Sequence, residues 1–238
     1  MSGFLYGVAL QWKLDIRSKS LLITCYVVPL LFFAVMGGIF TSINPEAKYT
    51  LIQSMTVMGV STGGLIGLPP SLVEIYGSDI KKVYKANGVP LYLGLVSMFL
   101  SAFIHLLIMG TIIYIVAPIA FDATPPTSLT MYFGSLAILI AVSLSIGSVL
   151  GLSVKNQAKL TMISQMIFLP SIMLSGIMFP ADLLPRFFKI VGKIIPATWG
   201  YKLMTDDVFN FGSLWPLMAI ILVAAILCSF LLRRLKSE

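Results

Sequence analysis

Six long apolar runs, separated by short charged connections, limit the folds open to this chain more than any other feature. They lie at roughly residues 21 to 43, 51 to 76, 89 to 116, 129 to 153, 159 to 179 and 214 to 232. Each is long enough to cross about 30 Å of hydrocarbon as a helix. With 58% hydrophobic and only 11% charged residues, the composition excludes an ordinary water-soluble domain. We therefore expect one all-α polytopic membrane domain over residues 1 to 238, with six transmembrane helices.

The basic residues predict how these spans are oriented. Six spans place both termini on one side, and that side would hold eleven of the 16 lysines and arginines. These are Lys13, Arg17, Lys19, Lys81, Lys82, Lys85, Lys155, Lys159, Arg233, Arg234 and Lys236. The positive-inside rule then predicts cytoplasmic termini. The net charge of +7 is expected to face the membrane surface rather than nucleic acid, since no basic patch is interleaved with base-stacking aromatics.

Residues 3 to 19 form an amphipathic pattern rather than a span. Apolar side chains, among them Phe4, Val8 and Trp12, recur at helical spacing, and charged ones fall largely on the other side. The pattern predicts a helix lying in the membrane interface, with Trp12 at headgroup level.

A short basic helix is predicted between the second and third runs. Ser78 or Asp79 can cap its start, and Asn87-Gly88 can end it. Ile80, Val83 and Tyr84 form an apolar stripe on a segment that is otherwise rich in lysine, including Lys85. Because so short a helix is marginal in water, we expect it to have a docking surface. The alternative is a capped loop held only by lipid headgroups.

Glycines and prolines interrupt the second run. Gly59, Gly63 and Gly67 share one helical face, and Pro69-Pro70 follows them. Close helix packing in lipid explains the glycines. A kinked, moving helix explains the prolines, which should break the hydrogen-bond ladder, and both interpretations can hold together.

The fifth run ends in a proline-rich segment that leads into a second amphipathic stretch. Pro180 and Pro185 are expected to set its entry angle, and Asp182 to cap it. Arg186, Lys189 and Lys193 then share one face, and apolar side chains fill the other. We expect the stretch from 182 to 195 to lie flat at the external membrane boundary. It would act there either as a gate over an exit path or as a passive anchor.

Two regions together resemble the permease subunits of type 2 ATP-binding-cassette exporters. The loop at 74 to 90 matches the family pattern at Glu74, Gly77 and Pro90, but has Val83 and Tyr84 in place of the consensus leucine. Ser175-Gly176 with Phe179-Pro180 matches the S-G-x-x-F-P turn, and the run at 196 to 201 matches the return before the last span.

The resemblance implies roles for these segments. Residues 3 to 19 would be the elbow helix, and the 74 to 90 loop would be the coupling helix that inserts into a separate ATPase subunit. The coupling residues would be Glu74, Gly77, Ser78, Asp79, Ile80, Val83, Tyr84 and Lys85. It also implies two permease chains, expected as a homodimer, with two ATPase chains that carry ATP and Mg. The assembly would lie in a bacterial plasma membrane, among its lipids.

Motif absences support transport rather than catalysis. The chain has no G-x-x-x-x-G-K-[ST] loop, so we expect no ATP, cofactor or metal on this chain, with one histidine and two cysteines in all. His105 is expected to be a neutral imidazole bonded to a neighbouring helix, or else a substrate or proton site. The expected substrate is an amphipathic peptide, an antimicrobial peptide or a lipophilic drug, as in the peptide-exporting branch. A lipid-linked glycan, or a non-transporting scaffold or channel, is the alternative.

Overall fold

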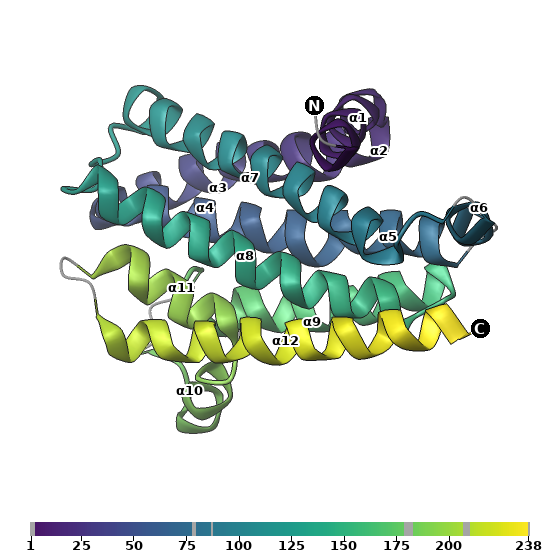
Figure 1. The fold of residues 1–238 in the computed structure, drawn as a ribbon. Helices are drawn as coiled ribbons and strands as arrows, with labels where there is room; N and C mark the ends of the chain where they lie inside the picture. The colour runs from purple at the N-terminus through teal and green to yellow at the C-terminus, as the bar shows by residue number, and fades with distance from the viewer. Residues whose placement is uncertain (1–2, 78–79, 87, 179–182, 207–209, 238) are drawn as a thin grey trace.

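The computed structural model describes residues 3–77, 80–86, 88–178, 183–206 and 210–237, and within these ranges it is helical, without a strand. In this part of the chain, five helices are long and apolar enough to cross a membrane. They are Ile23–Ile43, Leu51–Tyr76, Leu91–Phe121, Leu129–Ser153 and Phe211–Lys236. Figure 1 shows them side by side in one bundle. The expectation of an all-helical, multi-pass membrane protein is confirmed.

The elements follow in chain order. They are α1 (Gly3–Arg17), α2 (Lys19–Leu22), the π-helix η1 (Ile23–Val27), α3 (Val28–Ile43), the 3₁₀-helix η2 (Pro45–Tyr49), α4 (Leu51–Thr62), the π-helix η3 (Gly63–Gly67), α5 (Leu68–Tyr76), α6 (Ile80–Ala86), α7 (Leu91–Phe121), α8 (Leu129–Ser153), α9 (Gln157–Leu174), α10 (Arg186–Gly192), α11 (Pro196–Thr205) and α12 (Phe211–Ser237).

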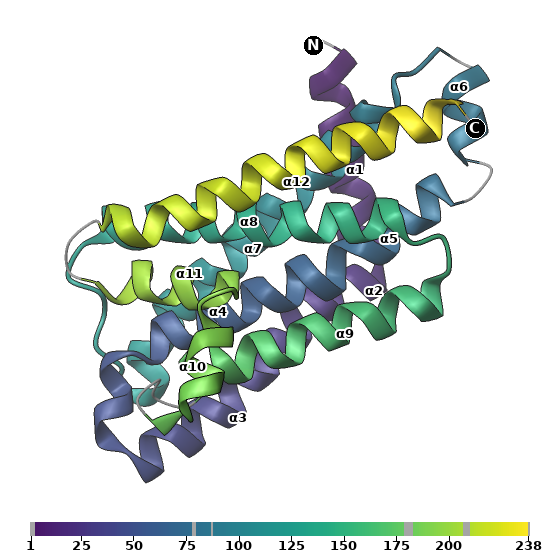
Figure 2. The same ribbon diagram turned by 90° about the horizontal axis from the view of Figure 1, so that it is seen from below.

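The predicted fifth span, at 159 to 179, corresponds to α9, which is not among the five. α9 has 18 residues, about 27 Å of helix, and runs alongside the other long helices (Figure 2). It ends at Leu174 instead of near 179, and Gly176 follows with a φ of 89°. Glycine adopts that left-handed conformation without steric cost, which takes the chain out of the helix. The count of six spans is therefore not confirmed.

The second span, formed by α4, η3 and α5, lies at the centre of the bundle. In its most hydrophobic stretch 94% of the residues are buried, against 22% in the first span and 17% in the last. It packs against α3, α7, α8, α9 and α11. The polar residues of α4 are therefore enclosed by protein, and Thr62, for example, donates its hydroxyl to Met58 O at 2.9 Å.

The short elements gather at the two ends of the bundle. Figures 1 and 2 place α6, the connection between α8 and α9 and the end of α12 together, at what we name the α6 end. η2, the connection between α7 and α8 and the start of α12 lie at the opposite, α11 end. α1 crosses the bundle outside α7, and α10 projects from its side.

Candidate functional site

Two tyrosines fix α6 to the rest of the bundle. Tyr76, the last residue of α5, is buried and donates its hydroxyl to Leu91 O at 2.6 Å. The ring of Tyr84 packs on α7 at Gly94, where an added Cβ would lie 2.9 Å from Tyr84 Cε2 and 3.0 Å from Tyr76 Oη. Glycine at 94 therefore lets both rings reach α7, and α6 is held in a defined position at the end of the central helix.

The predicted stripe on α6 is divided between two directions. Ile80 is 41% exposed and Val83 56% exposed, whereas Tyr84 is half-buried. Consecutive residues in a helix point about 100° apart, so Tyr84 turns inward when Val83 faces out. Tyr84 therefore packs on α7 while Ile80 and Val83 are exposed, and a docking face shared by all three stays a prediction. Glu74 and Gly77 are exposed nearby. Ser78, Asp79 and the side chain of Lys85 lie outside the described residues.

The prolines of the second span do not break its helix. Gly63–Gly67 adopt a π-helical turn, and α5 continues from Leu68 with Pro69 and Pro70 in its first turn. The Leu68 N–H bonds back to Gly63 O, five residues earlier. A widened turn immediately before two prolines accommodates their missing N–H groups, so the expected break is a continuous π-bulge instead.

The glycines of the second span meet different neighbours. An added Cβ would reach Met109 Cε of α7 at 2.6 Å from Gly59 and would overlap Leu106 of α7 from Gly63. From Gly67 it would lie 3.4 Å from Thr24, which is an ordinary van der Waals distance. Gly64 packs on α8, where an added Cβ would lie 2.9 Å from the Ser143 backbone carbon. The tightest backbone approach thus falls at Gly64, beside the predicted glycine row.

Helix α1 packs on α7 around the chain's single histidine. The indole of Trp12 stacks on the His105 imidazole, with ring centroids 4.2 Å apart and planes 15° apart. The Tyr26 hydroxyl lies 2.8 Å from His105 Nδ1. His105 is 2% exposed, and its Nε2 has no partner among the described residues. An imidazole bonded to a neighbouring helix is what the sequence led us to expect.

A carboxyl group is buried in the same contact. Asp15 of α1 is 5% exposed and accepts a hydrogen bond from Gln11 Nε2 at 2.8 Å. Burial raises the pKa of Asp15, and the nearby Ser101, Gln11 and His105 side chains offset part of that rise. The α1–α7 contact is therefore polar and titratable, unlike a helix that only lies on lipid.

The amphipathic stretch near the α11 end is shorter than predicted. α10 spans Arg186–Gly192 and ends before Pro196, which instead begins α11. Arg186, Lys189 and Lys193 are exposed, but so are the apolar Phe187 (68%) and Ile190 (59%). Against the described residues, α10 buries only Gly192 and no apolar face. Pro180 and Asp182 lie outside the described residues, and Pro185 immediately precedes α10.

Side chains of α11 terminate α10. Thr198 Oγ1 donates to Gly192 O at 2.6 Å, and Trp199 Nε1 donates to Lys193 O at 2.7 Å. Both bonds satisfy carbonyls that a helix end leaves without partners. Gly200 packs closely on Leu139 of α8. The residues from 196 to 201 that resemble the family motif thus join α10 to the bundle.

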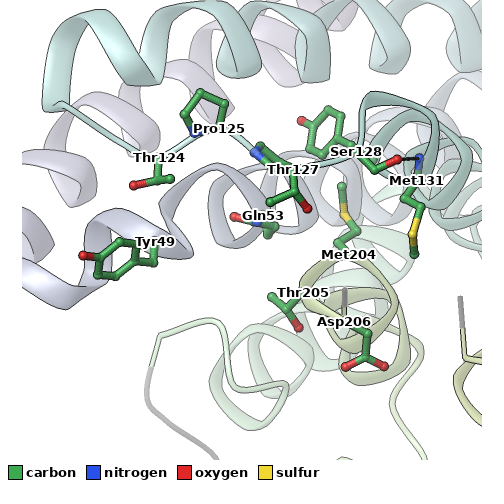
Figure 3. A pocket seen from close by; sticks show the side chains of 12 residues that line it. Tyr49, Gln53, Thr124, Pro125, Thr127, Ser128, Met131, Met204, Thr205 and Asp206 are labelled. Carbon is green, nitrogen blue, oxygen red and sulfur yellow. Dashed lines mark hydrogen bonds between the residues drawn. The ribbon is translucent and has the colours of Figure 1, made fainter. Parts of the chain in front are cut away.

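A polar cavity opens at the α11 end, with a volume of about 220 Å³ (Figure 3). Its walls come from η2, α4, the 124–128 connection, α8 and α11. The connection is held in place because Thr124 N donates to Lys48 O at 3.0 Å and Ser128 Oγ accepts from Met131 N at 3.3 Å. Tyr132 forms part of the wall, and its hydroxyl pairs with Thr56 and bonds to Gly110 O.

Sequence reasoning missed this cavity. Gln53 is a polar residue inside an apolar run, and that was the one available signal. Asp206 and the 124–128 connection carry no sequence motif. They line the same cavity as Gln53 only because three connections converge at one end of the bundle.

Comparison with known families identifies the chain. The family model described as ABC-2 type transporter matches residues 4–209, which is most of the chain. No curated protein matches it significantly. The matched region is the transmembrane component of such a transporter and not its ATP-binding cassette. This protein belongs to the ABC-2 type transporter family, as a multi-pass membrane permease.

Proposed function

We propose that this chain is the permease subunit of an ATP-driven exporter that moves an amphipathic or lipophilic substrate, such as a basic peptide, out of a bacterial cell. A separate ATPase subunit binds ATP and Mg and docks on α6. The α6 end faces the cytoplasm, because the elements that meet there carry eight of the 16 lysines and arginines, among them Lys155, Lys159 and Arg233.

The link between α6 and the central helix supports this proposal most strongly. Tyr84 holds α6 on α7, while Val83 remains 56% exposed at the tip. α5 continues from the π-bulge at Gly63–Gly67 and ends at Tyr76, next to α6. A force on α6 would therefore act at the end of the most buried span, which is one continuous helix from α4 through η3 to α5. π-bulges within helices are frequently found at functional sites.

The exposed face of α9 supports pairing with a second copy. Among its exposed apolar residues, Met162, Met166, Leu169 and Met173 recur at spacings of four, three and four, and Ile167 is exposed beside them. That spacing produces the seam along which two helices pack in a coiled coil, and methionine adapts to irregular partners. We infer that α9 is also a span, the fifth of six in chain order, and that it faces the partner permease in a homodimer around the substrate path.

Copurification with the ATPase tests the docking of α6. Val83→Asp should release the ATPase or uncouple its ATP turnover, because burying a carboxylate in an apolar groove costs several kcal/mol. The matched control is Tyr92→Asp, which changes a 59% exposed side chain near the start of α7 at the same end. Equal ATPase retention and coupling in both variants would contradict the proposed docking.

A further inference from the structure

The cavity at the α11 end is lined by an amide whose oxygen has no hydrogen-bond partner among the described residues. Gln53 is 6% exposed, and its Oε1 is buried without a hydrogen bond among the described residues. Figure 3 shows its side chain between Tyr49 and Met204. Buried polar groups in proteins are nearly always paired, so an unpaired one beside a cavity indicates where a ligand or water would bind.

The charge around the cavity is one-sided. Asp206 is the single ionisable acid among the cavity's twelve lining residues, which include no lysine, arginine or histidine. Two cations of this end are engaged elsewhere: Lys48 pairs with Asp122 at 3.5 Å, and Lys202 lies over the Trp199 ring at 5.3 Å. Although the chain as a whole has a net charge of +7, the local charge of this cavity therefore favours a cation.

The remaining wall suits an alkyl chain that ends in such a cation. Met131 and Met204 contribute polarisable thioethers, and Tyr49 contributes an aromatic ring. A volume of about 220 Å³ is smaller than a typical drug pocket, so it suits one side chain rather than a whole drug. Thr124 and Thr127 add hydroxyl groups at the rim that can accept from an ammonium.

We propose that this cavity binds a primary alkylammonium group of the lysine type, which donates to the Gln53 amide oxygen while the Asp206 carboxylate in the wall supplies the opposite charge. Its role as an exit-side contact for a basic peptide substrate depends on the proposed export function, but the binding itself does not. An ethanolamine lipid headgroup also carries a primary ammonium. Its phosphate lies two carbons away and would bring a negative charge toward Asp206, so the lysine type is favoured.

Binding of small probes to the purified permease, without any ATPase, tests this assignment. The probe is N-acetyl-lysine methylamide, followed by ligand-observed NMR, and its Nε-acetylated form is the neutral analogue. We expect saturable binding of the charged probe, at least tenfold weaker binding of the neutral analogue, and weaker binding of phosphoethanolamine. Equal binding of charged and neutral probes, or tighter binding of phosphoethanolamine, would overturn the proposal.

Two variants locate the binding. Asp206→Asn should weaken the charged probe at least tenfold, or about 1.4 kcal/mol. The matched control, Asp122→Asn, changes an exposed carboxylate at the same end, and asparagine tolerates the φ of 50° at this position. Gln53→Leu should also weaken binding. Unchanged affinity in Asp206→Asn, or an equal loss in Asp122→Asn, would contradict the site. Because no ATPase is present, this result is independent of coupling through α6.

Discussion

Trp12 of α1 stacks on His105 of α7, with the ring centroids 4.2 Å apart, and this contact attaches the interfacial helix to the bundle. The stack covers a histidine that is 2% exposed, whose Nε2 has no hydrogen-bond partner within the described part of the chain. α1 therefore lies on α7 through a specific aromatic and polar contact, not only through lipid. The position of α1 is consequently sensitive to single substitutions.

Removing the Tyr26 hydroxyl should destabilise this contact. Tyr26→Phe removes the 2.8 Å hydrogen bond between the Tyr26 hydroxyl and His105 Nδ1. An unsatisfied buried polar group costs about 1–3 kcal/mol. Thermal unfolding of the purified protein would show a lower midpoint. Tyr92→Phe, at a 59% exposed position, is the control and should leave the midpoint unchanged. Equal midpoints in the two variants would contradict the role of Tyr26.

The buried Asp15 should make the docking of α1 depend on pH. Its raised pKa means that between its ordinary value of 3.8 and the raised value the docked form binds more protons than a detached, solvated α1. Docking should therefore weaken as the pH rises through that interval and level off above it. Asp15→Asn should remove this dependence and stabilise the protein at neutral pH. Thermal melts from about pH 4 to about pH 8 measure it.

A matched control separates this effect from general charge effects. Asp122→Asn changes a largely exposed carboxylate and should preserve the pH dependence. A thermal midpoint of the wild-type protein that rises with pH over the same interval would contradict the inferred burial of Asp15.

Added methyl groups should distinguish the glycines of the bundle. Gly64→Ala would press on the Ser143 backbone at 2.9 Å, which cannot turn aside, and overpacking of this kind costs about 1–3 kcal/mol. Gly134→Ala on α8 meets nothing within 4 Å and should gain about 0.5–1 kcal/mol of helix stability. Thermal midpoints that move in the same direction in both variants would remove the evidence for close packing at Gly64.

The sequence predicted the spans well because length and hydropathy alone decide them. The second span was placed at 51 to 76, and the fourth at 129 to 153, as the structure has them. α9 was extended too far because its end depends on the backbone at Gly176, which hydropathy does not register. The break expected at Pro69-Pro70 was wrong because the glycines before it allow a π-bulge.

The site was harder to predict, since it depends on contacts between distant segments. Tyr84 turns inward because Gly94, ten residues later, leaves room for its ring. The cavity around Gln53 needs three connections to converge, and the Asp15–His105 contact needs α1 to cross α7. Periodicity within one segment carries no information on such pairs.

Accessible cysteines should report which end of the bundle faces outward. Arg186→Cys on the exposed α10 should react with a membrane-impermeant thiol reagent added to intact cells, whereas Val83→Cys on α6 should react only after lysis. The native Cys25 and Cys228 are buried and should give little background. Labelling of Val83→Cys in intact cells would reverse the proposed orientation.

The most direct test of the proposed export is ATP-dependent movement of a basic amphipathic peptide in vesicles that contain both the permease and its ATPase. With α6 and the ATPase outside, the peptide should accumulate inside only when hydrolysable ATP is added, and Val83→Asp should abolish the accumulation. Peptide entry that is equal without ATP would indicate a channel and contradict an ATP-driven exporter.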